Sequence, residues 1–475
     1  MSKRVLFINP AKTDNFTVDR IHMGLSLLGH ILVGEGCDVK VVDYAYLRGI
    51  QDKFKTPRIE DIIRDFRPDV VGVSVFTYLY KESAELLDTI SKFNDAPVIV
   101  GGPHVTFFPQ DFGKDSRVSY IVRGEAELII SDIVGSAKKQ FPPAVINSPL
   151  PPAEKIPAVN LDICEGASHC TCFQIQLSRG CPFDCSFCNI EQVAGHKVRA
   201  RDLDPCVEEI AEAIRKYPSI RSVVITDDCP NFNKERFKRF LTIFAARIRG
   251  RALTIDNVRA DLLDEEMLKL YLKAGGRNIC VGAESGYPEV FMLVNKGESI
   301  DKISAAARLI RKHNISLGLC FVIGLPEDSP ERHKYSVKLA RELKPDYAFW
   351  NMCTPWPGTR VHDWFNKHGT IGDVRNFSTL IDSELDFQLP RAWTPDFTQE
   401  QRIKAWLSAN LETYVLPVNW GRPLRAPFLV IKLLRLSWKY GVCGSAIKYF
   451  LGFIPRRLMS IWKRHIMRRM VEGGA

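Results

Sequence analysis

The chain has no uninterrupted apolar run approaching the roughly 20 residues that a helix needs to span a bilayer. The first apolar run, residues 5–8, is also far too short for the hydrophobic segment of a secretory signal peptide. Repeats of fixed period and low-complexity segments are absent as well, which argues against a solenoid. We therefore expect a globular cytoplasmic protein, long enough at 475 residues for two or three domains.

Acidic residues are almost missing from the end of the chain. From Gly421 onward, twelve Lys and Arg residues stand against one acid, Glu472, so this tail has a net charge of +11 and the rest of the chain is close to neutral, within a formal net charge of +10 for the whole chain. Its cations alternate with aliphatic and aromatic residues, as in basic amphipathic helices that lie on anionic membranes. Two interpretations stay open: peripheral contact with the inner face of the membrane, or a helix packed on the protein with a solvated basic face. The aliphatic residues make nucleic acid the less favoured partner.

Short β-branched runs alternate with amphipathic stretches in the first part of the chain, the pattern of a parallel sheet covered by helices. The predicted strands are residues 4–9, 39–43, 70–76, 98–101 and 120–122. They predict a Rossmann-like or flavodoxin-like domain over residues 1–141, with its ligand beyond the carboxyl ends of the strands. A proline-rich stretch then predicts a linker over residues 142–172.

The alternation resumes in the second part of the chain. The predicted strands are residues 173–177, 222–226, 252–258, 278–283, 316–323 and 347–352. Six β/α units predict a partial (β/α)6 barrel of the TIM type over residues 173–365, with its chemistry at the carboxyl ends of the strands. One helix is predicted to begin after Asp264. Residues 366–475 are expected to form a mostly helical, basic C-terminal region, so the predicted fold class is α/β.

Three cysteines, Cys181, Cys185 and Cys188, lie within eight residues in the loop after the first barrel strand. Thiolates at this spacing can ligate three irons of a four-iron cluster and leave the fourth iron open to another ligand. A structural zinc site is the alternative, but it requires a fourth protein ligand that the local sequence lacks. Thirteen cysteines at scattered spacings suit a reducing compartment better than a disulfide framework.

This CxxxCxxC motif resembles the cluster loop of the radical S-adenosylmethionine (SAM) superfamily, with Phe187 as the aromatic residue before the last cysteine. The resemblance implies a [4Fe-4S] cluster whose open iron chelates the amino and carboxylate groups of SAM. An electron from the cluster would cleave SAM to a 5′-deoxyadenosyl radical that abstracts hydrogen from a substrate. A reductant such as flavodoxin or ferredoxin would supply that electron.

Further segments resemble the same superfamily at the ends of successive strands. Asp227 and Asp228 follow the second strand, where a carboxylate can accept from the methionine ammonium group. Arg259 follows the third strand, where a guanidinium can hold the methionine carboxylate; a structural ion pair is the alternative. The other residues that the resemblance assigns to SAM are Glu284, Ser285 and Gly324.

The first domain resembles the cobalamin-binding domain of the B12-dependent subgroup of this superfamily. Small residues at adjacent strand ends would let the backbone approach a flat corrin ring. The residues that the resemblance assigns to cobalamin are Asn9, Ser74, Gly101, Gly102, Pro103, Gly124 and Glu125. The Asp-x-His-x-x-Gly segment that sends a histidine to cobalt in other cobalamin domains is absent. His22 and His104 are the nearest candidates, and a lone histidine here is more often a turn or surface residue, so we expect cobalt without a histidine ligand.

These observations predict a cobalamin-dependent radical SAM enzyme of the methyltransferase type. The expected reaction is methyl transfer to an unactivated carbon of a small-molecule or lipid-like substrate. Radical ring closure or rearrangement, with or without cobalamin, is the second interpretation. A non-catalytic iron-sulfur redox protein is the rival from another class; the missing fourth cysteine and the ordered cofactor-like segments argue against it.

Overall fold

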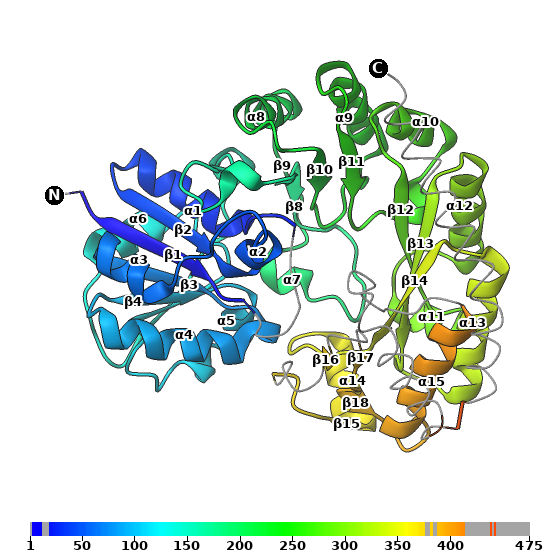
Figure 1. The fold of residues 1–475 in the computed structure, drawn as a ribbon. Coiled ribbons are helices and arrows are strands. Elements are labelled where there is room, and N and C mark those ends of the chain that lie inside the picture. Colours follow the sequence, from blue (N-terminus) through cyan, green and yellow to red (C-terminus); the bar gives the residue numbers. More distant parts are fainter. Residues whose placement is uncertain are drawn as a thin grey trace.

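The computed structural model describes residues 2–11, 19–375, 381–382, 387–413, 438 and 441–442. Two α/β units lie side by side in Figure 1, a sheet domain in blue and cyan and a barrel-like unit in green and yellow. The basic tail predicted from Gly421 onward lies outside the described residues, apart from residues 438 and 441–442. In the described part of the chain, no helix is long and apolar enough to cross a membrane.

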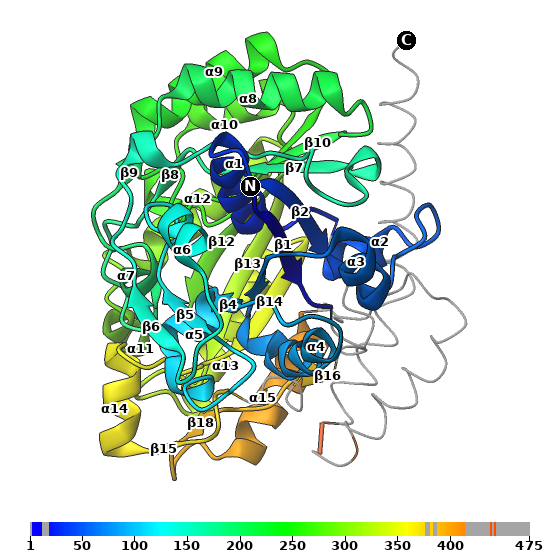
Figure 2. The ribbon, with the colours of Figure 1, turned by 90° about the vertical axis from the view of Figure 1, so that its left-hand side faces the viewer.

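The N-terminal unit is a six-stranded parallel sheet in the order β2-β1-β3-β4-β5-β6, seen in front of the barrel in Figure 2. Its strands are β1 (Arg4–Asn9), β2 (Asp38–Asp43), β3 (Val70–Ser74), β4 (Val98–Gly101), β5 (Tyr120–Arg123) and β6 (Ala144–Asn147). The order is the flavodoxin-like one, with a sixth strand added, and it confirms the predicted fold. Strand β6 falls within the predicted linker. It follows Pro142 and Pro143 at the edge of the sheet, where proline is tolerated.

Helices cover the sheet, and the strands between them are buried. These helices are α1 (Met23–Gly34), α2 (Tyr44–Gly49), α3 (Ile59–Phe66), α4 (Tyr80–Phe93), α5 (Pro103–Phe107) and α6 (Ile130–Ser136). Helix α1 contacts α6, and α3 contacts α4. Every residue of β1 after Arg4 is buried, as expected for a strand covered on both faces.

The segment between the two units returns to the edge of the N-terminal sheet. The Val41 amide donates to the Ile163 carbonyl at 2.7 Å, and the Glu165 amide donates to the Val41 carbonyl at 2.9 Å. Lys40 and Glu165 form an ion pair at 2.8 Å beside them. The stretch predicted as a linker therefore fastens the barrel to strand β2.

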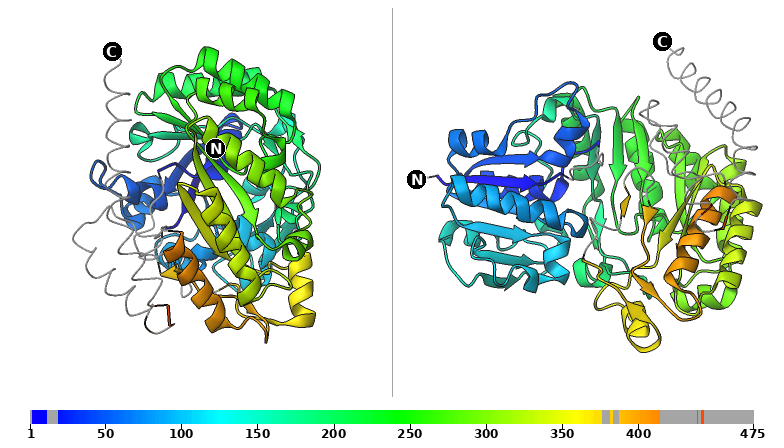
Figure 3. Two further views of the ribbon diagram at one scale, coloured as in Figure 1. Left: turned by 90° about the vertical axis from the view of Figure 1, so that its right-hand side faces the viewer. Right: turned by 60° about the horizontal axis from the view of Figure 1, so that its bottom comes forward.

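The second unit is the predicted partial barrel. Its strands are β7 (Cys172–Ile175), β10 (Ser222–Ile225), β11 (Ala252–Ile255), β12 (Asn278–Glu284), β13 (Ser316–Ile323) and β14 (Tyr347–Met352). They form two parallel sheets, β11-β10-β7 and β12-β13-β14, which the bridges Leu253↔Gly276 and Val258↔Val281 join into one curved wall. The helices lie outside this wall (Figure 3) and are α8 (Leu203–Lys216), α9 (Lys234–Arg247), α10 (Glu265–Lys273), α12 (Ile300–Lys312) and α13 (Pro330–Leu343). The α10 prediction is confirmed, because Asp264 caps it by accepting from the Met267 amide at 2.9 Å.

Shorter elements follow the barrel. They are α14 (Arg360–His368), β15 (Thr370–Ile371), β16 (Ile381–Asp382), β17 (Phe387–Gln388), β18 (Ala392–Trp393) and α15 (Gln399–Glu412). Helix α15 begins with a capping box between Thr398 and Gln401, and it packs on α13 and β14. The two antiparallel pairs, β15-β18 and β16-β17, were not expected in a region predicted to be mostly helical.

Two glycines of the barrel unit provide a matched test of the packing. Gly275 has a φ of +89°, and a Cβ there would lie against the Arg251 carbonyl; Gly250 has a φ of +67° with no atom within 4 Å of that position. Gly250→Ala should lower the free energy of unfolding by about 1–2 kcal/mol for the left-handed backbone alone. Gly275→Ala should lower it by about 1–3 kcal/mol more through overpacking. Urea denaturation of both variants measures the difference, and equal losses would contradict this packing.

Candidate functional site

The three motif cysteines occupy a loop that follows β8 (Ser178–Arg179), and all three are partly buried. Burial raises the pKa of Cys185 to about 12 and also raises the pKa of Cys188, and the neighbouring cysteines add to both effects. The pKa of Cys181 is lowered to about 7 because the Cys229 thiol donates a hydrogen bond to it. Three crowded thiols of this kind ionise together only when cations neutralise them, so the donor set fits iron ligation. Within the described residues, no three His, Cys, Asp or Glu side chains are gathered as around a single metal ion.

Neighbouring elements hold this cysteine loop on both sides. The Gly180 amide donates to Asp228 Oδ2 at 2.7 Å, next to Cys181. At the other end, the Ser186 amide and hydroxyl donate to carbonyls of α11 (Pro288–Val294), both at 2.8 Å. Phe187 packs against the small apolar cluster around that helix. The loop is therefore held from both sides by Asp228 and by α11.

The two aspartates after β10 have different tasks. Asp227 is buried and accepts from the Leu177 amide at 2.7 Å and from the Ser178 hydroxyl at 2.5 Å, and burial raises its pKa to about 7. Its carboxylate thus fastens the chain between β7 and β8. Asp228 accepts from Gly180 and also lines the cavity described below, and burial raises its pKa too. Of the two, Asp228 is the one placed to accept from a bound ligand.

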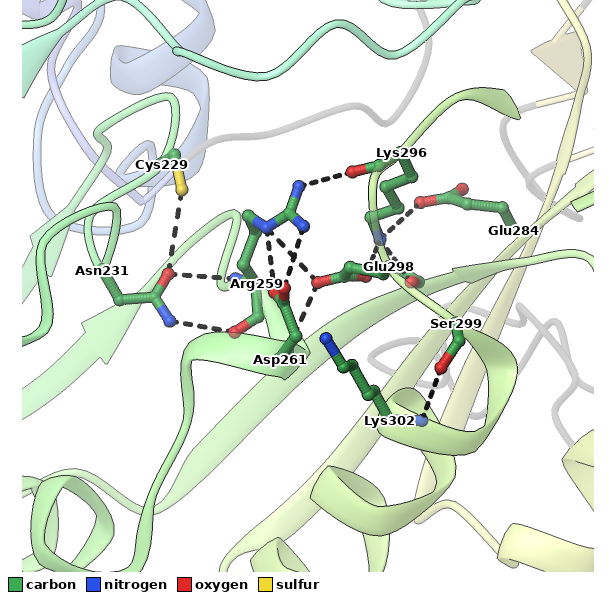
Figure 4. Close-up of polar contacts among 10 residues, drawn as sticks. Cys229, Asn231, Arg259, Asp261, Glu284, Lys296, Glu298, Ser299 and Lys302 are labelled. Atoms are coloured by element: carbon green, nitrogen blue, oxygen red, sulfur yellow. Dashed lines mark hydrogen bonds and ion pairs between the residues drawn. The ribbon is translucent and has the colours of Figure 1, made fainter. Parts of the chain in front are cut away.

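Arg259 lies inside a network of buried ions (Figure 4). Its guanidinium pairs with Asp261 at 3.0 Å and with Glu298 at 3.5 Å, and it donates to the Lys296 carbonyl at 2.6 Å. It also lies 3.5 Å from the ring centre of Phe183 in the cysteine loop. This arrangement matches the structural alternative weighed for Arg259, because two carboxylates already neutralise it.

Glu284 and Ser285 end β12 at a bulge, and both are buried. Glu284 has a φ of +54° and pairs with Lys296 at 3.1 Å, and Ser285 accepts from the Tyr287 amide at 3.2 Å. A non-glycine residue in the left-handed region is uncommon and marks a backbone held by its surroundings. At this bulge the Glu284 carboxylate meets Lys296, a residue that the sequence analysis missed.

Gly324 follows β13 with a φ of +77°. Its carbonyl accepts from the Arg402 guanidinium of α15 at 2.8 Å, and its amide donates to Asp328 at 2.9 Å. A Cβ at this position would collide with Arg402. The close approach of Arg402 therefore already requires a glycine here, without a cofactor.

A cavity lies between the carboxyl ends of the N-terminal strands and the start of the barrel. Its lining contains these residues assigned to cobalamin: Ser74, Gly101, Gly102, Pro103, Gly124 and Glu125. The barrel unit contributes Gln176, Arg179, Ile190, Val193, Ala194 and Asp228. Asn9 is not among the lining residues; its amide donates to Asp43 at 2.8 Å and so supports the start of α2. The cavity thus brings together both units and all but one of the seven residues predicted to bind cobalamin.

The floor of this cavity fits a flat ring. Gly102 has a φ of +101°, and a Cβ there would lie 3.0 Å from the Val75 carbonyl oxygen. Gly124 has a φ of +84°, and its Cβ would lie 3.3 Å from the Ser148 carbonyl oxygen. Glycine is needed at both positions, and its lack of a side chain leaves room above the strand ends.

Neither predicted histidine offers a free nitrogen to a metal in the cavity. His22 accepts from the Leu25 amide through Nδ1 at 3.2 Å, so its Nε2 carries the proton and donates to Ser74 at 2.8 Å. Burial lowers the pKa of His22, which keeps the ring neutral. His104 is fully buried beside Thr77 and Asp111 and does not line the cavity. This geometry agrees with the expectation of cobalt without a histidine ligand.

A buried ion cluster joins the two units at the cavity wall. Arg179 pairs with Glu125 and with Glu127, both at 2.6 Å, and Arg199 pairs with Glu125 at 2.5 Å. All four side chains are largely buried. The sequence analysis missed both arginines, although Arg179 directly precedes the Gly-Cys pair that opens the motif.

Comparisons with known proteins agree with this geometry. Residues 175–340 match the Radical SAM superfamily model, and residues 13–134 match the B12 binding domain model. The chain is 26% identical to the uncharacterized methyltransferase PH0819 of Pyrococcus horikoshii, covering 83% of this chain and 88% of the relative. It is 27% identical to the anaerobic magnesium-protoporphyrin IX monomethyl ester cyclase of Rubrivivax gelatinosus, covering 74% and 66%.

One group of solved structures shares the fold over most of the chain. The radical SAM methyltransferase TsrM from Kitasatospora setae, with tryptophan and a SAM analogue bound, superposes with a TM-score of 0.65 at 19% identity, covering 88% of this chain and 90% of TsrM. The same enzyme with cobalamin and a [4Fe-4S] cluster gives a TM-score of 0.63. The two matched domains imply SAM, a [4Fe-4S] cluster and cobalamin as cofactors, as predicted. The chain therefore contains a B12-binding domain over residues 13–134 followed by a radical SAM domain over residues 175–340.

Proposed function

We propose that this protein is a cobalamin-dependent radical SAM methyltransferase that methylates an unactivated carbon. One observation carries the proposal: Asp228 both lines the glycine-floored cavity and holds the cysteine loop through Gly180. Arg179, which lines the same cavity, directly precedes Gly180. The place suited to a corrin and the place suited to a cluster therefore share a wall.

The residues of the chain divide the work between these two places. Cys181, Cys185 and Cys188 would hold the cluster, while the small residues at the ends of β4 and β5 would hold the corrin. When bound, the cluster and SAM would supply a hydrogen-abstracting radical, and cobalamin would supply the methyl group. Asp228 is the acceptor for the ammonium group of SAM, and Glu284 is the acceptor for ribose hydroxyls.

The inner face of the barrel supports a substrate with an apolar part. Trp350 of β14 stacks on Phe321 with ring centres 4.4 Å apart and meets His333 of α13, so this face of the strand points to the helices. The alternate residues Tyr347 and Phe349 then face inward, and Phe349 is 49% exposed. We therefore propose a small-molecule or lipid-like substrate, and flavodoxin or ferredoxin as the reductant.

Substitution of the motif cysteines tests the cluster. The Cys181→Ala/Cys185→Ala/Cys188→Ala variant should fall from about four irons per chain to almost none, because it loses the thiolates that ligate the irons. With dithionite and SAM it should form no 5′-deoxyadenosine, while it still binds hydroxocobalamin. Cys206→Ala, which changes a buried thiol of α8, is the matched control and should retain iron and SAM cleavage. Iron retention by the triple variant would disprove the assignment.

The same reconstituted chain separates methyl transfer from ring formation. With corrin reduced to cob(I)alamin, a methyltransferase should convert SAM into S-adenosylhomocysteine as the methyl group moves to cobalt. An enzyme that only forms radicals should yield 5′-deoxyadenosine alone. Liquid chromatography of the two nucleosides decides between the outcomes, and deoxyadenosine without S-adenosylhomocysteine would favour ring closure or rearrangement.

The ring contacts of His22 predict the cobalt spectrum. Because both nitrogens of His22 are already engaged, bound Co(II) should show no hyperfine splitting from a protein nitrogen in its EPR spectrum. His22→Ala should leave the cobalt signal unchanged in shape. A nitrogen splitting that disappears in His22→Ala would show that this histidine ligates cobalt.

The basic tail supports a further proposal of peripheral membrane contact. Its twelve cations would be attracted by anionic lipid, each contributing about 1 kcal/mol near the surface. In a flotation assay, the full chain should rise with phosphatidylglycerol vesicles, and a variant truncated after residue 420 should remain at the bottom. Equal flotation of both chains would refute a membrane role for the tail.

A further inference from the structure

A buried lysine behind the cysteine loop has no role in the proposed function so far. Lys296 lies between α11 and α12 with its side chain 9% exposed. Its ammonium group pairs with Glu284 at 3.1 Å and with Glu298 at 3.3 Å, and it donates to the Gly282 carbonyl (Figure 4). A buried charge is costly unless it is paired, and here three acceptors satisfy it.

The backbone around Lys296 runs along the cysteine loop. The Asn295 side chain donates to the Asp184 carbonyl at 2.8 Å and to its carboxylate at 3.0 Å. One residue earlier, the Val294 carbonyl accepts from the Ser186 amide at 2.8 Å. These contacts lie on both sides of Cys185, so Lys296 is tied to the part of the loop that carries a cluster ligand.

The charge of Lys296 is retained at this buried position. The pKa of Lys296 itself is raised: burial disfavours its charge, but Glu284 and Glu298 outweigh that effect. The lysine therefore remains a fixed cation next to the loop.

Arg259 is a second cation beside the loop, where it pairs with Asp261 and Glu298 and lies on the Phe183 ring. Lys296 instead follows Asn295, whose side chain contacts Asp184, the residue before Cys185. Lys302 is exposed, where solvent screens its charge. Loss of Lys296 would leave Glu284 without a cationic partner beside the loop.

We propose that Lys296 is a positioning residue that sets the reduction potential of the cluster. Reduction adds an electron to a cluster that already carries three thiolates, and a fixed cation in a medium of low dielectric constant stabilises the added negative charge. The lysine thus brings the cluster to the potential at which its reductant can drive SAM cleavage. This inference rests on the proposed function, because it requires a cluster at the three cysteines.

An EPR-monitored redox titration of the reconstituted full-length chain, without SAM, tests the proposal. Lys296→Met should shift the midpoint potential to a more negative value, and Lys296→Arg should restore it. Glu284→Gln should shift the midpoint in the opposite direction, because less carboxylate charge then offsets the positive charge of Lys296. Lys302→Met, which changes an exposed cation of the same network, should leave the midpoint unchanged.

Iron content separates the possible failures. If the wild-type chain binds no iron, the proposed function fails and not this inference. If Lys296→Met keeps four irons but its midpoint is unchanged or more positive, the inference is overturned. Should Lys296→Met fail to fold, Glu284→Gln decides alone: a positive shift supports the role of Lys296, and no shift or a negative shift overturns it.

Discussion

The hydrogen bond from the Gly180 amide to Asp228 connects the cysteine loop to the cavity between the two units. Asp228 stands at the end of β10, where the strand presents its carboxylate to the cavity between the two units. The same carboxylate fixes the backbone immediately before Cys181. One side chain therefore contacts both the backbone before Cys181 and the cavity, so a shift of that side chain would alter both.

Charge pairs support this contact from two sides. On the N-terminal side, Arg179 and Arg199 meet Glu125 and Glu127 and seal the junction between the units. Below the cysteine loop, Lys296 and its neighbouring carboxylates form the second group. Breaking a buried pair by removing one partner typically costs about 3–5 kcal/mol, because an unpaired charge is left behind. Buried ion pairs therefore hold the site from both sides.

The strands of both units were predictable because they read as mostly apolar runs, and strands of the N-terminal sheet such as β1 and β3 are buried on both faces. Strands 4–9, 98–101, 316–323 and 347–352 have the predicted bounds. Strand β6 was not predictable, because it alternates half-buried and exposed residues at a sheet edge after two prolines. The two-residue strands after the barrel are too short to show the alternation of side chains by which a strand is recognised in a sequence.

The site was predictable only in part. Motif residues and strand-end glycines can be found in the sequence because their spacing is local. Cys229 and Arg179 acquire their roles from partners far along the chain, and Lys296 acquires its role from its place beside the cysteine loop; a single lysine, cysteine or arginine has no signature of this in the sequence. At Gly324 the local motif pointed to the cofactor, but the structure gives the glycine another reason. The Arg402 guanidinium, 78 residues further along the chain, approaches it closely.

The central claim is that the corrin and the cluster share one cavity wall. EPR of the reconstituted chain with Co(II) and the reduced cluster in the same molecule tests this claim most directly. If the account is correct, the two spins will interact, and each signal will be broadened or relax faster than in samples that carry only one of the centres. A spectrum that is the simple sum of the two separate signals would contradict the account.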